Sequence, residues 1–250
     1  MNTQFFYIFI SKYITHYGTF SLTAKMSSGI SNYCDTLIFI DFASIIFPRG
    51  DIMLKFRKGC TVPFPEKIHE EYEINDNCII ANINADKIED LLLDFIKLHN
   101  EPLFFILEIP SKQCAETEIK PGIVESLHKD VYYIDGCTQE EAFVIVSRVG
   151  KLLVNDGLSS FGFGCHISHD EIMVGKYNVI TIYSQNLDSY NVLLEKNELK
   201  RVNNLITAWD TFTHDAPGET ERIETNGKNV FDIPEMFADW GIYLAEQRED

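Results

Sequence analysis

The fold is decided by residues 78–109, which read CIIANINADKIEDLLLDFIKLHNEPLFFILEI. Cys78–Ile83 is a short apolar run typical of a buried strand, and Leu103–Ile109 is a second one. Between them, Asn84 is a suitable N-cap for a helix over Asp86–His99. The apolar side chains of that helix recur on one face, at Ile88, Leu91, Leu92, Phe95 and Ile96. The stretch therefore predicts a strand, a helix and a second strand.

The same order of elements recurs further along the chain. Val131–Ile134 is a short strand, and Thr138-Gln-Glu-Glu141 is a capping box that opens a helix ending near Asn155. Gly157 stands where the left-handed residue that ends a helix belongs. Two strands and a helix are predicted next, over Leu158–Ile167, Lys176–Ser184 and Leu187–Glu195.

The remaining segments are predicted from β-rich runs and turn signals. Thr36–Phe47, Asp51–Phe56 and Leu205–Phe212 are predicted as strands, and the charged stretch 66–73 as a surface connection. Asn226-Gly227 is a hairpin signal between Glu221–Thr225 and Lys228–Asp232, and Pro234 suits the first turn of a last helix. The prediction is an α+β fold (mixed α/β): central β-sheets flanked by helices, two similar strand-helix-strand halves, and a C-terminal hairpin and helix.

The length of 250 residues allows one large domain or two small ones. Residues 26–110 and 130–250 are predicted as an N-terminal and a C-terminal α/β half, or as one continuous domain. Residues 1–25 are aromatic without a clear period, so they are interpreted as a peripheral segment, and a chain starting at Met26 is expected to fold similarly. The alternative is an ordinary edge strand.

Charge limits the classes of partner. The net charge is −17, with +3 on residues 1–60 and −20 on residues 61–250. A field of this sign repels nucleic-acid phosphates and anionic lipids and attracts basic proteins. No stretch approaches the 18 apolar residues of a membrane span. We therefore expect a basic protein partner, and no nucleic-acid or membrane partner. The alternative is that the negative charge serves solubility alone.

The cysteines and the sequence motifs favour neither a metal nor a cofactor. None of the six cysteines lies within two to four residues of another, and no secretory signal precedes them. Free thiols in the cytoplasm are the expectation. Cys137 comes just before a helix start, where the helix dipole lowers a thiol pKa, but no histidine base is placed beside it. The chain has no GxSxG, GxxxxGK[ST] or HExxH motif.

Residues 161–171, which read FGFGCHISHDE, are one candidate functional site. On a strand, Phe161, Phe163, Cys165 and Ile167 share one face, while Gly162, Gly164 and His166 share the other. A glycine-lined face admits a ligand or a neighbouring backbone, and close packing of a helix is the favoured explanation.

His166 and His169 converge only if the chain turns at Ser168. With Asp170 or His214 they would then form a two-histidine, one-carboxylate metal site. This is the basis of the alternative function: a small metal-dependent or Cys/His hydrolase or transferase.

The favoured candidate site is a surface within WDTFTHDAPGETE, residues 209–221. It consists of one aromatic residue, one histidine and four carboxylates: Trp209, Asp210, His214, Asp215, Glu219 and Glu221. An aromatic ring supplies contact area and carboxylates steer a cationic partner. We therefore predict a cytoplasmic, non-enzymatic binding protein, of the immunity or antitoxin type, that inhibits a basic, nuclease-like protein. The alternative is a solvated loop with Trp209 in the core.

Overall fold

The computed structural model describes Tyr13–Ile14, Phe20–Ser21 and residues 53–111, 117–120, 123–125 and 128–249. The chain divides into two compact units, Met1–Gly50 and Asp51–Asp250. In the first unit, strands β1 (Tyr13–Ile14) and β2 (Phe20–Ser21) pair antiparallel. The rest of the predicted segment 1–25 and the strand predicted at Thr36–Phe47 lie outside the described residues.

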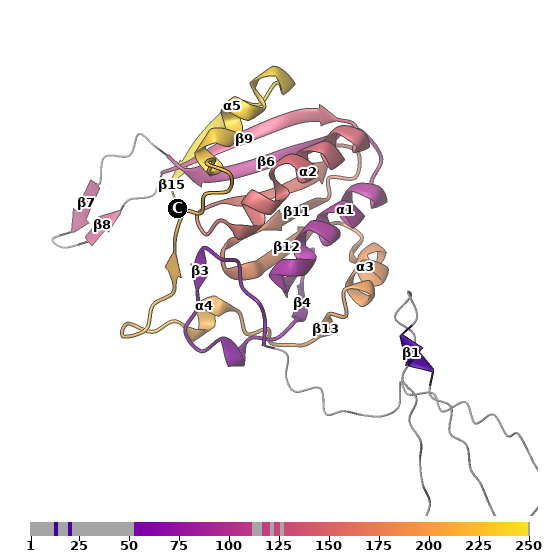
Figure 1. The fold of residues 1–250 in the computed structure, drawn as a ribbon, viewed down its shortest axis with the longest axis vertical. Coiled ribbons are helices and arrows are strands. Elements are labelled where there is room, and N and C mark those ends of the chain that lie inside the picture. The colour runs from indigo at the N-terminus through magenta and orange to yellow at the C-terminus, as the bar shows by residue number, and fades with distance from the viewer. Residues whose placement is uncertain are drawn as a thin grey trace, which may run out of the picture. The chain divides into compact units, whose positions relative to one another are not determined.

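Nine of the described strands in the second unit form one sheet, in the order β13-β4-β5-β12-β11-β10-β6-β9-β15 (Figure 1). Neighbours are antiparallel except for the parallel pair β13–β4. The strands are β4 (Glu71–Asn75), β5 (Cys78–Asn82), β6 (Leu103–Pro110), β9 (His128–Cys137), β10 (Ser160–Cys165), β11 (Glu171–Val174), β12 (Val179–Tyr183), β13 (Lys200–Arg201) and β15 (Tyr243–Glu249). The predicted α+β class is confirmed, and both predicted halves contribute strands to this one sheet.

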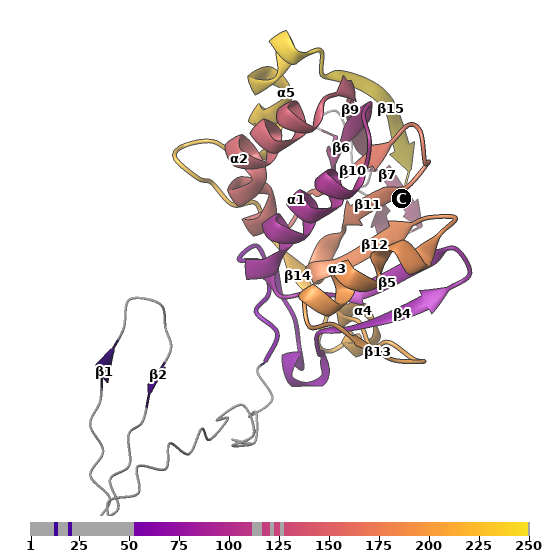
Figure 2. The ribbon, with the colours of Figure 1, turned by 90° about the vertical axis from the view of Figure 1, so that its right-hand side faces the viewer.

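The main helices cover one face of the sheet, as Figure 2 shows. They are α1 (Ile88–Leu98), α2 (Gln139–Asn155) and α3 (Asn191–Lys196). Alternate strand residues such as Phe105, Phe163 and Ile172 point to this side and pack with the helices in the hydrophobic core. None of the three helices lies on the opposite face, and the part of that face on β6, β10, β11 and β12 is called the helix-free face below.

Shorter elements complete the unit. The hairpin β7 (Thr117–Lys120) with β8 (Ile123–Glu125) and the pair β3 (Cys60–Thr61) with β14 (Glu219–Thr220) lie outside the main sheet. The short helices are α4 (Ala208–Thr211), α5 (Ile233–Met236) and the 3-10 turns η2 (Pro65–Lys67), η3 (Ala85–Lys87), η4 (Lys176–Asn178), η5 (Leu187–Tyr190), η6 (Val230–Asp232) and η7 (Ala238–Trp240).

The two strand-helix-strand predictions are confirmed. Helix α1 buries the expected face of Ile88, Leu91, Leu92, Phe95 and Ile96 between β5 and β6. At the start of α2 the Glu141 amide donates to the Thr138 hydroxyl at 3.1 Å, and the Thr138 amide donates to the Glu141 carboxylate at 2.8 Å. This is the predicted capping box, and it fixes where α2 begins.

The strand prediction for Leu205–Phe212 is wrong, because this stretch contains the one-turn helix α4. Asp210 accepts hydrogen bonds from the amide and the hydroxyl of Thr207, both at 2.8 Å. A side chain that satisfies the free N–H groups at a helix start overrides the β preference of these residues. Two further predictions differ from the structure. The predicted surface connection 66–73 contains the start of β4, and residues 53–56 of the predicted strand Asp51–Phe56 form no strand.

The C-terminal predictions are partly realised. Asn226 and Gly227 make the expected turn with positive φ, but it closes with a single bridge between Thr225 and Lys228. The last helix begins at Ile233 but spans only four residues, and after Gly241 (φ 78°) the chain continues as edge strand β15.

Gly157 does not have the predicted left-handed φ; its role is close approach. A Cβ at this position would lie 1.8 Å from the carbonyl oxygen of Gly59. The Gly157 amide donates to the Glu221 carbonyl at 3.0 Å, and the Glu221 amide donates to the Gly59 carbonyl at 2.8 Å. Two glycines thus let three distant segments meet at backbone-to-backbone distance.

Arg57 lies beside this contact with only 1% of its surface exposed. Its guanidinium donates to four carbonyl oxygens at 2.7–3.2 Å, those of Leu153, Val154, Ser159 and Gly175. Burial lowers the pKa of Arg57, while nearby Asp156 acts in the opposite direction. The first two acceptors belong to the last turn of α2, where a cation is favoured by the helix dipole.

Replacement of Arg57 by methionine tests this arrangement. The variant keeps an apolar stem but leaves four buried carbonyl groups without their donor, so we expect a loss of about 3–5 kcal/mol of unfolding free energy. Urea unfolding measures the change. Lys55→Ala removes an exposed ion pair with Asp86 and should cost less than about 1 kcal/mol; equal losses in the two variants would contradict the role given to Arg57.

Candidate functional site

Trp209 lies on α4, and 52% of its surface is exposed. The covered part of its ring packs edge-on against Tyr177 and Phe212, with centroid distances of 4.8 and 5.4 Å. Tyr177 and Phe212 themselves lie 4.9 Å apart, so the three rings form a closed cluster. The ring of Trp209 is therefore held in place and yet presented to solvent, which differs from the alternative of a core tryptophan.

The segment that follows Trp209 is anchored at both ends. The Phe212 ring lies against Gly218, where a Cβ would come within 2.1 Å of it. Beyond Gly218, Glu219 and Thr220 pair with β3, and Glu221 joins the contact at Gly59 and Gly157. The exposed carboxylates of this segment are thus carried on a defined backbone.

The structure brings most of the predicted partner-binding residues onto this segment, but they do different things. Asp210 is occupied as the cap of α4, and Asp215 contacts only His214, at 3.4 Å. Glu219 and Glu221 are exposed, and no lysine or arginine of the described ranges forms an ion pair with either of them. The name Trp209 surface is used below for Trp209, Asp210, His214, Asp215, Glu219 and Glu221.

The FGFG segment forms β10 with the predicted division of faces. Phe161, Phe163 and Cys165 lie in the core, while Ile167 falls beyond the strand and is exposed. The interpretation of Gly162 and Gly164 as a helix-packing face is wrong, because the helices lie on the other side of the sheet.

Groups of the neighbouring strands occupy the space above these glycines. A Cβ on Gly164 would lie 2.0 Å from the ring of Phe104. One on Gly162 would lie 1.9 Å from the carbonyl oxygen of Ile172, with the sulfur of Met173 at 2.9 Å. Gly164 therefore lets the Phe104 ring lie on the helix-free face of the sheet, and Gly162 admits the backbone of β11.

His166, His169 and Asp170 do not converge. His166 contacts Asp135 at 3.2 Å, His169 is an exposed turn residue with φ 58°, and Asp170 turns inward. His214 lies on the Trp209 surface. Among the residues that the structure describes, no group of three or more His, Cys, Asp and Glu side chains could hold a metal ion.

Asp170 instead joins a buried network around His99, which sequence reasoning missed. The Nε2 of His99 lies 3.0 Å from the Asp170 carboxylate and 3.1 Å from the Tyr190 hydroxyl, and its Nδ1 lies 2.8 Å from the Phe95 carbonyl. Both ring nitrogens of His99 therefore have hydrogen-bond partners within the fold.

The network borders a shallow cavity of about 300 Å³ that Leu98, Ile167 and Asn186 also line. Burial by itself would raise the pKa of Asp170, but hydrogen bonds from Ser184, His99 and Ser168 outweigh burial and lower it. Burial and the Asp170 charge raise the pKa of Tyr190. The group thus joins the end of α1, the turn before β11 and η5 through charge and hydrogen bonding.

Cys137, which precedes the start of α2, is not an activated thiol in the structure. Burial raises the pKa of Cys137 to about 11, and Glu141 adds to the effect. The Sγ donates to the Ile134 carbonyl at 3.4 Å. Cys137 is a small core residue, and the helix dipole does not offset its loss of hydration.

Comparisons with family models, with curated proteins and with solved structures find no match to this chain. No helix in the described ranges is long and apolar enough to cross a membrane.

Replacement of Asp170 by asparagine tests the buried network. Because the pKa of Asp170 is lowered on folding, its stabilising contribution is present above the ordinary value of about 3.9 and is lost as the pH falls through the lower folded value. We expect the variant to lose about 3 kcal/mol at pH 7, with the gap to the parent narrowing below about pH 4. Urea unfolding between pH 3 and pH 7 measures both; parallel curves would contradict the assignment.

Proposed function

We propose that the protein binds a basic protein partner through the Trp209 surface. The observation that carries this is a half-exposed tryptophan, fixed by Tyr177 and Phe212, beside carboxylates that lack a cationic partner in the described part of the chain. Aromatic residues and fixed loops are typical of the centre of protein interfaces, and the surrounding charges select the partner.

The two components of the surface act at different stages of binding. The exposed part of the Trp209 ring supplies apolar area for the final complex, and its packing means that little side-chain entropy is lost on binding. Asp215, Glu219 and Glu221 act over longer distances, by raising the rate at which a cationic partner arrives. This division predicts separate effects on dissociation and association.

The class of partner follows from the charge of the unit. Asp51–Asp250 contains 18 basic and 36 acidic residues, a net charge of −18. A nuclease must itself be cationic where it binds phosphates, so an acidic protein is suited to occupy such a surface. We infer an immunity-type or antitoxin-type inhibitor of a nuclease-like protein that acts in the cytoplasm.

Two variants and a salt series test the function on a partner captured by the immobilised full chain. In Asp215→Asn/Glu219→Gln/Glu221→Gln, the association rate should fall severalfold at low salt and approach the parent rate at physiological salt. The reason is that the Debye length shortens from about 30 Å to about 8 Å. Trp209→Ala should instead increase the dissociation rate about tenfold or more.

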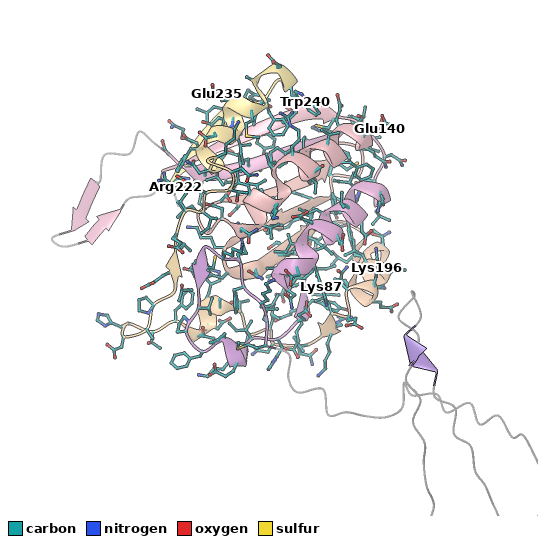
Figure 3. All side chains as sticks on the ribbon, in the orientation of Figure 1. Lys87, Glu140, Lys196, Arg222, Glu235 and Trp240 are labelled. Carbon is teal, nitrogen blue, oxygen red and sulfur yellow. The ribbon has the colours of Figure 1, made fainter. Side chains whose placement is uncertain are left out.

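The matched control is Glu140→Gln/Glu235→Gln/Asp239→Asn, which removes the same charge from the opposite end of the molecule. Figure 3 shows Glu140 and Glu235 near its top, whereas α4 lies at the bottom of the same view in Figure 1. The captured protein should be basic, and its nuclease activity should be inhibited by the parent chain. A neutral partner, or equal loss of association rate in the two triple variants, would refute the proposal.

A further inference from the structure

The helix-free face of the sheet carries an ordered row of side chains opposite the core. The register of the strands places Tyr183 beside Glu171, Glu171 beside Gly164, and Gly164 beside Phe104. Strands are separated by about 4.8 Å, so Glu171 lies one strand from Tyr183 and about 10 Å from the backbone of Phe104. The row therefore consists of an aromatic residue, a carboxylate, a glycine that leaves a gap between side chains, and a second aromatic residue.

The gap in this row is filled sideways by the Phe104 ring, which lies over Gly164. Phe104 also contacts the rings of Tyr133 and His166, at centroid distances of 5.7 and 4.9 Å. Half of the surface of Tyr183 is exposed. Glu171 is thus bordered by aromatic rings on both sides of its own strand, and part of this aromatic surface reaches solvent.

Glu171 is the unusual member of the row because its charge is poorly compensated. Burial raises its pKa, and the charge of Glu108 raises it further. Arg248, which opposes this effect from a distance, is engaged in ion pairs with Glu108 and Glu246. No cation in the described residues forms an ion pair with Glu171.

Asp135, the acid on the strand next to Phe104, already has partners, which singles out Glu171. Asp135, opposite Phe104 on β9, contacts His166 at 3.2 Å and accepts a hydrogen bond from the Tyr243 hydroxyl. A half-buried carboxylate flanked by aromatic rings favours a cation that is planar, weakly hydrated and able to stack. Guanidinium fits this description, whereas the strongly hydrated ammonium of lysine fits it less well.

We propose that the helix-free face of the sheet docks an arginine side chain of a partner protein, with the guanidinium on the Glu171 carboxylate between Tyr183 and Phe104. This Glu171 face, defined as Phe104, Glu171 and Tyr183, lies at the end of β11 and β12 opposite their connection through η4. Trp209 packs on Tyr177 of η4. The Glu171 face is therefore a second surface, and the inference does not depend on the Trp209 surface.

A labelled peptide of four Arg-Ser repeats and a matching peptide of four Lys-Ser repeats are the probes, with the full chain and fluorescence anisotropy at physiological salt. We expect the arginine peptide to bind more tightly than the lysine peptide, by about tenfold. Glu171→Gln should weaken arginine binding about tenfold or more, because it removes a charge-assisted hydrogen bond with almost no change of shape. Tyr183→Leu should weaken it about threefold.

The control is Glu235→Gln, which removes one exposed charge from α5, outside both proposed surfaces, and should leave arginine binding unchanged within about twofold. Glu171→Gln should fold, because it removes a charge whose burial is unfavourable; circular dichroism and urea unfolding check this. Backbone NMR shifts caused by the peptide should map to β10, β11 and β12. Absence of binding, equal affinity for the lysine peptide, equal loss in Glu235→Gln, or self-association that Glu171→Gln abolishes would each overturn the proposal.

Discussion

The guanidinium of Arg57 binds carbonyl groups from the end of α2, the start of β10 and the turn before η4, so three segments must reach their final positions together. An arginine can be buried without a direct carboxylate partner only if its donors are matched, and here four carbonyl oxygens match them. The close contact of Gly59 with Gly157 fixes the same junction from the backbone side. The sheet, the helix layer and the segment that carries the Trp209 surface all pass through this junction.

Elements with a long local pattern could be predicted from the sequence, whereas elements set by distant partners could not. Helices α1 and α2 show an apolar face or a capping box, and both were found. Strand β15 carries Glu246, Gln247 and Arg248 because it is an edge strand exposed to solvent, so it lacks the alternation that identifies a strand. Helix α4 is a single turn stabilised by one side-chain cap, which is too short for a periodic signal.

The candidate sites show the same limit. The acidic and aromatic residues from 209 to 221 are visible in composition, but the exposure of Trp209 depends on its packing against Tyr177, 32 positions earlier in the chain. His99 meets Asp170 across 71 residues, so no local spacing indicates the pair. The glycines of β10 were recognised as sites of close approach, but which face they open toward is set by where the helices pack. Sequence patterns identify residues with suitable chemistry, and the tertiary fold decides which of their side chains reach solvent.

The position of Arg57 also has a consequence during synthesis on the ribosome. Its most distant carbonyl acceptor, on Gly175, is made 118 residues later. At roughly 5–20 residues per second this leaves the guanidinium without its final partners for about 6–24 s. β5, α1 and β6 are made during that interval, but the centre of the sheet cannot close, because β10, β11 and β12 lie between β5 and β6. The apolar strands β5 and β6 therefore remain without their central neighbours in the nascent chain until β12 is made.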